Sequence, residues 1–215
     1  NLEFQTNATT RLKLDANSRI SLSNNDSGDN NTIFGYGAAE NFSSNNDNNV
    51  VIGHNALDAA DGTEGSNIAI GENAMGAVDE GSHGSATGDD NVAIGYNALF
   101  GGSFGSSNLQ LAGNIAIGSY ALDGTGANAQ TGVVAIGHHA LGAVSSGTNN
   151  TGVGYFAGRF ITTGAGNTIL GYGAMDEVPV AASYNTALGF SAMGGDSDGN
   201  TASDYNTAVG AYALN

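Results

Sequence analysis

The chain is short of the residues that most proteins use to hold a fold together. Cysteine and tryptophan are absent, proline occurs once, and Leu, Ile, Val and Phe together make up about a fifth of the 215 residues. The absence of cysteine leaves the cellular compartment open. A chain with so few large apolar residues cannot build a thick globular core. It is therefore either disordered or folded by a scheme that needs little core per residue.

Basic residues are equally scarce, with 4 Lys and Arg against 20 Asp and Glu and a formal net charge of −16. Three of the four (Arg11, Lys13 and Arg19) lie close together near the start of the chain. Because nucleic-acid binding depends on Lys and Arg neutralising phosphates, we expect no nucleic-acid partner. No apolar run approaches the 18 residues of a membrane span, so we expect no membrane insertion.

What the chain does have is ten copies of a short repeat with the pattern Gly-x-x-Ala, spaced by 17 to 24 residues. The repeat glycines are Gly35, Gly53, Gly71, Gly95, Gly118, Gly137, Gly154, Gly171, Gly189 and Gly210. Self-similarity at such a period is typical of solenoids, in which neighbouring repeats stack and share one core. The repeat therefore favours an ordered solenoid over disorder.

Three further columns keep register with the glycine. A large apolar residue stands directly before it in every copy, and Leu or Met stands four residues after it in eight copies. Four residues before it stands Asn in nine copies, with Val133 in the tenth. These asparagines are Asn31, Asn49, Asn67, Asn91, Asn114, Asn150, Asn167, Asn185 and Asn206.

The alternation of small and large residues before each glycine predicts a short β-strand, and the Ala-Leu pair after it predicts the start of a second one. We expect stacking to bury the large residue before the glycine and the Leu or Met after it as two apolar ladders. The small residues would then form a flat face, and aligned asparagines would form an amide ladder. The resulting fold is an all-β, parallel β-solenoid of about ten coils over residues 31–215.

Residues 1–30 lack the repeat and form a separate N-terminal unit. Residues 11–22 alternate in polarity around Asp15, Ala16, Asn17 and Ser18, which predicts a β-hairpin with a polar turn. This hairpin would cap the solenoid or connect it to an upstream shaft. We expect the chain to be a segment of a longer protein.

The sequence offers little that predicts catalysis, and we expect no enzyme activity and no cofactor. His54 and His138 directly follow a repeat glycine, a variable position that favours surface residues. A weak calcium candidate is formed by Asp196, Asp198 and Asn200, but the Glu that completes an EF-hand loop is missing. Phe100 and Phe104, in one of the longest stretches between repeats, are candidate surface contacts.

The copies NVAIGYNAL, NTALGFSAM and NTAVGAYAL resemble the head repeats of trimeric autotransporter adhesins, the YadA-like β-roll. They are equally similar to repeats of bacteriophage tail fibres, where a run like FQTNATTRLKLDANSRISL (residues 4–22) often precedes them. The resemblance implies a left-handed β-roll, a parallel homotrimer, display on a virion or cell surface, and a role in adhesion or receptor binding. The coils here are longer than those of the adhesin heads.

Together these observations predict a structural segment of a phage tail fibre or other virion appendage, located on the virion surface and supporting recognition of a host receptor or glycan. The first alternative is the head of a bacterial surface adhesin, which would be extracellular. A polysaccharide-degrading spike is disfavoured because the uniform ladder leaves no obvious groove. Ice or mineral binding by a threonine array is disfavoured because Thr stands three residues before the glycine in only five copies.

Overall fold

A computed structural model describes most of the chain. The backbone is described for residues 2–6, 9–14 and 20–21, and backbone and side chains for residues 30–79, 87–102, 109–126, 128–177, 181–194 and 204–214.

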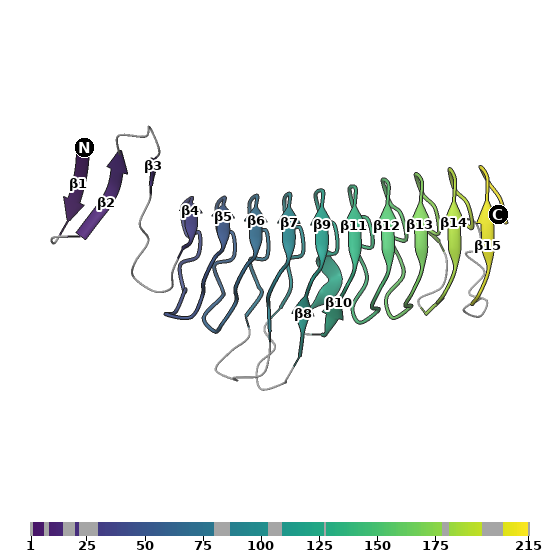
Figure 1. Cartoon of the computed structure of the whole chain (residues 1–215). Coiled ribbons are helices and arrows are strands. Elements are labelled where there is room, and N and C mark those ends of the chain that lie inside the picture. Colours follow the sequence, from purple (N-terminus) through teal and green to yellow (C-terminus); the bar gives the residue numbers. More distant parts are fainter. Residues whose placement is uncertain are drawn as a thin grey trace.

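Ten three-residue strands, one from each repeat copy, form a single parallel sheet (Figure 1). They are β4 (Thr32–Phe34), β5 (Val50–Ile52), β6 (Ile68–Ile70), β7 (Val92–Ile94), β9 (Ile115–Ile117), β11 (Val134–Ile136), β12 (Thr151–Val153), β13 (Thr168–Leu170), β14 (Thr186–Leu188) and β15 (Thr207–Val209). Equivalent repeat residues lie opposite each other, as Ile94 does opposite Ile117. At about 4.8 Å per strand the sheet is roughly 48 Å long. The predicted all-β parallel solenoid is confirmed.

The N-terminal unit is a separate antiparallel sheet of β1 (Leu2–Thr6), β2 (Thr9–Leu14) and β3 (Ile20–Ser21). Lys13 pairs with Ser21 and Leu14 with Ile20, which is the pairing of the hairpin expected over residues 11–22. The turn expected at Asp15 to Ser18 lies outside the described residues. A two-stranded parallel sheet of β8 (Leu111–Ala112) and β10 (Gln130–Thr131) lies in the middle of the solenoid.

The sheet points its small residues inward and its large residues outward, so the predicted orientation of the strands is wrong. The middle residue of each strand is buried in most coils, as Ala69, Ala93 and Ala116 are, with no exposed surface. The large residue directly before the glycine lies on the outer face, where Val209 is 64% exposed. In most coils the two layers lie close together and Ala fills the space between them, while the fully buried Ile169 of β13 is accommodated beside Gly158 of the preceding coil.

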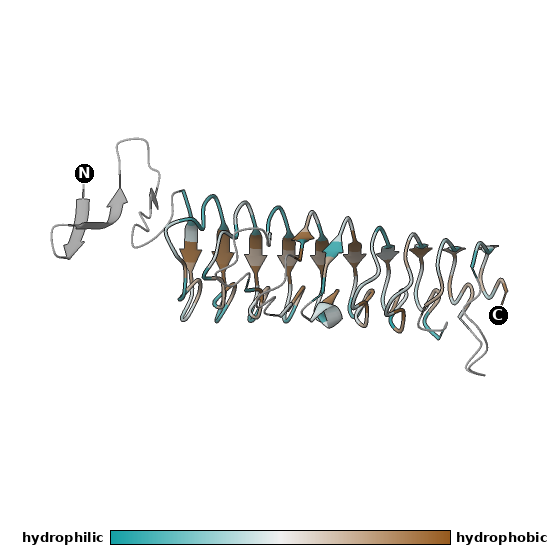
Figure 2. Ribbon diagram, turned by 90° about the horizontal axis from the view of Figure 1, so that it is seen from below, coloured by the Kyte–Doolittle hydropathy of each residue, from teal (hydrophilic) through white to brown (hydrophobic). Residues whose placement is uncertain are grey.

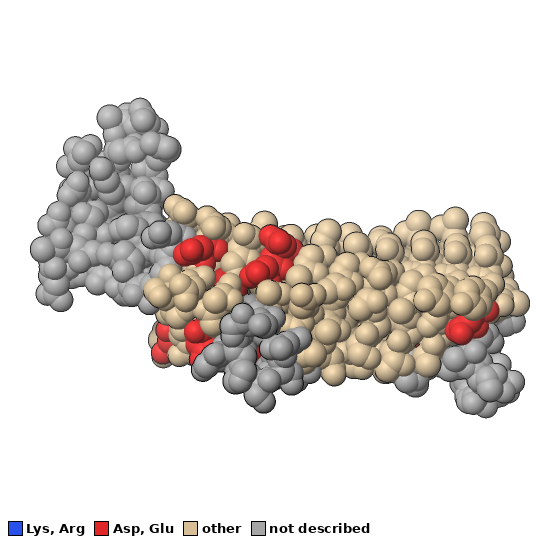
Figure 3. Space-filling view, turned by 60° about the horizontal axis from the view of Figure 1, so that its bottom comes forward, with Lys and Arg blue, Asp and Glu red and all other residues tan. Residues whose placement is uncertain are grey.

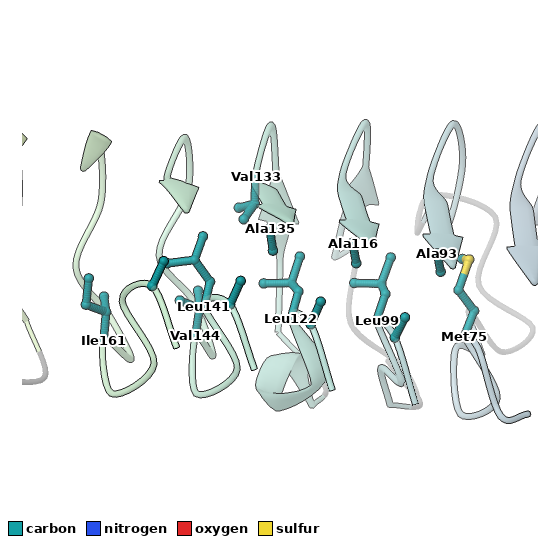
Figure 4. Packing of buried hydrophobic residues seen from close by; sticks show 14 of the residues in the cluster. Met75, Ala93, Leu99, Ala116, Leu122, Val133, Ala135, Leu141, Val144 and Ile161 are labelled. Carbon is teal, nitrogen blue, oxygen red and sulfur yellow. The ribbon is translucent and has the colours of Figure 1, made fainter. Parts of the chain in front are cut away.

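In eight coils the core is completed from the other side by the Leu or Met that stands four residues after the glycine. Leu99, Leu122 and Met75 are fully buried and point toward the alanines of the strands (Figure 4). They do not begin a second strand, as had been expected, but lie in a turn. Their φ angles are 46°, 51° and 54°, a left-handed conformation that a strand cannot adopt and that costs an L-residue about 1 kcal/mol or more.

One coil lacks both core residues, and its neighbours fill the space. The coil of β12 has Gly152 in the middle of its strand and Gly158 at the position of the buried Leu or Met. A side-chain carbon on Gly152 would lie 2.7 Å from Leu141, and one on Gly158 would lie 2.7 Å from both Leu141 and Ile169. The exceptional Gly158 is therefore matched by larger side chains in the two adjacent coils.

A further buried column lies seven residues after the repeat glycine, and sequence reasoning missed it. Its N–H closes a turn on the preceding core residue, as Val78 donates to the Met75 carbonyl at 3.1 Å and Val144 to the Leu141 carbonyl at 3.1 Å. Its described, fully buried members are Ala60, Val78, Thr125, Val144 and Ile161. The varied size and polarity of these residues hid the column in the sequence.

The asparagine column forms a ladder along one corner of the core. Apart from Asn31 and Asn150, each backbone N–H in it donates to the side-chain oxygen of the preceding coil, as Asn67 does to Asn49 Oδ1 at 2.8 Å. From Asn31 to Asn167 the side-chain amide also donates to a carbonyl of the next coil, as Asn49 Nδ2 does to the Glu64 carbonyl at 3.0 Å. At Val133 the ladder is interrupted, because valine has no oxygen to accept the N–H of Asn150.

Candidate interaction surface

The outer face of the ten-stranded sheet is the main candidate for an interaction surface. It consists of the first and third residues of every strand, which we call the outer face. Its third-residue column contains only large apolar side chains: Phe34, Ile52, Ile70, Ile94, Ile117, Ile136, Val153, Leu170, Leu188 and Val209. Each of these is partly or largely exposed. In Figure 2 the strands show as a row of mostly apolar segments between more polar turns.

The first-residue column of the outer face changes character along the rod. From β5 to β11 it is Val or Ile, including Val50, Ile68 and Val134. In the last four strands it is Thr, and these threonines lie in register with one another: Thr151, Thr168, Thr186 and Thr207. The outer face is therefore apolar in both columns at the middle of the rod and more polar at the C-terminal end.

Aromatic side chains flank the outer face at the tight turn after seven of the ten strands. The ring centroids of Tyr155 and Tyr172 lie 5.3 Å apart, and those of Tyr172 and Phe190 lie 5.1 Å apart, each pair nearly parallel. His138 stacks on Tyr155 at 5.0 Å. We call His138, Tyr155, Tyr172 and Phe190 the aromatic flank. The rings stack on their faces, so their edges are turned to solvent.

His54 and Arg159 have local partners. His54, which is exposed, stacks on Tyr36 at 5.7 Å, while His83 lies outside the described residues. The Arg159 guanidinium lies 4.0 Å from the Phe156 ring centroid, and its Nε lies 2.9 Å from Asp176 Oδ1. Arg159 is the sole Lys or Arg among the residues with described side chains. It joins two coils.

Acidic residues gather over the first coils, with a smaller group near the C-terminal end (Figure 3). Several of these carboxyls have raised pKa values because burial disfavours their charged form. Partial burial raises the pKa of Asp123 to about 6, and it also raises that of Asp89. Burial and a hydrogen bond with Asp79 raise the pKa of Asp61. Keeping these carboxylates ionised therefore destabilises the folded rod, and protonating them at low pH removes this penalty.

Of the sequence-predicted contact and calcium residues, Phe100 alone lies within the described part of the chain. Phe100 is half-buried, and its carbonyl accepts the Ala77 N–H at 2.9 Å. Phe104 and the calcium candidates Asp196, Asp198 and Asn200 lie outside the described residues. Sequence reasoning did not single out the aromatic flank, although the frequency of Tyr, His and Phe directly after the repeat glycine was a usable signal.

Within the ranges that carry side chains, no cluster of three or more His, Asp or Glu is arranged to hold a metal ion. No helix among the described residues is long and apolar enough to cross a membrane. Comparisons with protein-family models, with curated proteins and with solved structures gave no match.

Proposed function

We propose that the chain is a rigid structural segment of a surface fibre, assembled as a parallel homotrimer through its outer face. The fibre is a phage tail fibre or other virion appendage that holds recognition elements for a host receptor or glycan away from the particle. The observation that carries the proposal is the unbroken column of large apolar residues on the outside of a straight parallel sheet.

The extent of this column argues for a protein partner. The outer face is roughly 48 Å by 10 Å, or about 500 Å², which lies at the upper end of the apolar patches that monomers leave exposed. Leaving the side chains of Ile94, Ile117 and Ile136 exposed to water costs about 25 cal/mol of free energy for each Å² of apolar surface. Identical rods with parallel axes bring identical faces to one axis, and a closed ring of copies buries all of them.

Val and Ile occupy the first-residue column of the outer face from β5 to β11, which favours a protein partner over ice. A bacterial adhesin head remains the alternative, because it would use the same rod and the same face. The two are separated by location. Mass spectrometry of purified virus particles is expected to detect the chain, and its restriction to bacterial cell-surface fractions would replace the phage proposal by the adhesin.

The assembly itself is tested by light scattering. The wild-type chain is expected to have a mass about three times its own 21.3 kDa. Replacing two stacked outer-face residues, Ile94→Glu and Ile117→Glu, places charges on the shared face and is expected to give a monomer with unchanged circular dichroism.

A matched control is Thr163→Glu, which adds the same charge at an exposed position outside the sheet. It is expected to leave the trimer intact. A monomeric wild-type protein with full β-structure would contradict the proposed assembly, and a trimer that persists in the Ile94→Glu, Ile117→Glu variant would show that another face mediates it.

A further inference from the structure

Two tyrosines at the opposite end of the strands from the aromatic flank are placed at a conformational cost. Tyr184 and Tyr205 directly precede the repeat asparagines of β14 and β15, with φ angles of 58° and 61°. A bulky residue is disfavoured in this left-handed conformation. At the same position the other coils have residues that tolerate it: Asn30, Asn48, Ser66, Asp90, Gly113, Gly132, Asn149 and Gly166.

Burial within the chain does not offset this cost. Tyr184 is 56% exposed and Tyr205 is 77% exposed. Their rings stack on each other with centroids 5.1 Å apart and an interplanar angle of 10°. We call them the tyrosine pair. An aromatic pair that is held in a disfavoured conformation and left largely in water is the kind of surface that protein contacts bury.

The tyrosine pair and the aromatic flank lie along opposite edges of the outer face and meet at strand β14. Tyr184 precedes β14 and Phe190 follows it, so the two occupy the same height along the rod. Phe190 remains 45% exposed and Tyr172 51% exposed although each stacks on neighbouring rings. Both edges of the outer face are therefore aromatic at the coil of β14.

The proposed threefold assembly brings these two edges together. All strands of the sheet run in one direction across the rod. In a threefold assembly the copies are related by rotation about an axis parallel to the rod. The end of each strand in one copy therefore lies next to the start of the equivalent strand in the next copy. Such contacts join two different edges and close into a ring. We propose that the aromatic flank of each protomer packs against the tyrosine pair of the next, forming three identical aromatic seams; this inference rests on the proposed trimer.

Disulfide crosslinking tests the seam, and the chain has no cysteine to interfere. In the double variant Tyr184→Cys, Phe190→Cys the two cysteines of one chain are separated by a whole strand, whereas those of adjacent protomers face each other. Oxidation is expected to give covalent trimers on a non-reducing gel. The matched control is Tyr184→Cys, Glu72→Cys, in which Glu72 is equivalent to Phe190 in its own coil but lies about 29 Å along the rod. It is expected to give no covalent trimers.

A second variant keeps the inference testable if cysteine disturbs the surface. Tyr184→Asn with Tyr205→Asn removes the pair while favouring the left-handed conformation. We expect the trimer to dissociate at about tenfold higher protein concentration than the wild type, with unchanged circular dichroism. A trimer by light scattering that fails to crosslink, or that is indifferent to the Asn variant, would overturn the seam and leave the assembly standing. A monomeric wild type would overturn both.

Discussion

At the scale of single residues, the fold depends on side chains that bond from one coil to the next. Asn167 is an example: its Oδ1 accepts the Asn185 N–H at 2.9 Å, and its Nδ2 donates to the Ala182 carbonyl at 2.8 Å. Both backbone groups lie where no strand partner reaches them. The asparagine column therefore supplies, at the corner of each coil, the hydrogen bonds that a β-ladder supplies along its strands.

Replacing Asn167 by Ala is expected to leave the Asn185 N–H and the Ala182 carbonyl without partners in a buried corner. Each such group costs about 1–3 kcal/mol, so we expect a loss of about 2–6 kcal/mol in the free energy of unfolding, measured by urea denaturation. Asn206→Ala is the matched control. Asn206 Nδ2 donates to the carbonyl of the exposed Asp204, so a smaller loss is expected. Equal losses in the two variants would contradict the role of the ladder.

At the scale of the coil, close contact between turns sets how the strands stack. Every repeat glycine before Gly210 packs against the backbone of the glycine in the next coil. A side-chain carbon on Gly118 would lie 2.6 Å from the Gly137 carbonyl oxygen, and the Gly118 φ of 130° is itself disfavoured for other residues. The N–H of Ala121 closes the turn on the Gly118 carbonyl at 3.2 Å. The glycine thus permits both the bend and the coil spacing.

Substituting Ala at Gly118 is expected to cost about 3 kcal/mol or more, because it adds a backbone clash to the unfavourable φ. Gly210 separates the two effects. Its φ is 125°, but the nearest atom to an added side-chain carbon is Ala213 Cβ at 4.0 Å. Gly210→Ala is therefore expected to cost only about 1–2 kcal/mol. The difference between the losses in free energy of unfolding of the two variants, measured by chemical denaturation, gives the contribution of the coil-to-coil contact. Equal losses would contradict this contribution.

At the scale of the whole molecule, the negative charge of the carboxylates destabilises the folded state. The net charge is −16, and burial raises the pKa of Asp58, Asp61, Asp89 and Asp123. The folded state therefore holds protons more tightly than the unfolded chain, in which an Asp has a pKa near 3.9. Stability contributed by these groups is greatest in acid and is lost as the pH rises through their raised values.

The melting temperature of the wild type is accordingly expected to rise as the pH is lowered from 8 to 5 at constant protein concentration. Asp123, with its pKa of about 6, is the group to remove. After allowance for solvent screening of its partly exposed carboxylate, Asp123→Asn is expected to stabilise the protein at pH 8 by about 1 kcal/mol, or about 2–4 °C, and to have little effect near pH 4. Glu177→Gln, at an exposed position, is the control. A melting temperature that falls between pH 8 and 5 would contradict this account.

Much of this architecture was determined by the sequence alone. The registered Gly and Asn columns required stacked copies, and the alternation before each glycine required a strand. The inner residue of the strand was not determined, because Ala93 and Ile94 are both apolar and a period of two assigns them to opposite faces without naming the inner one.

The tertiary structure decided that question through the distance between the two layers of the coil. Leu99, turned inward by its left-handed backbone, takes most of the space and leaves room only for a small residue, Ala116, opposite it in the next coil. The volume between the two layers cannot be predicted from the local sequence, because residues from different coils determine it. Gly152, Leu141 and Ile169 are an example. The large residues were thereby placed outside, which turned a presumed core column into the candidate surface between copies.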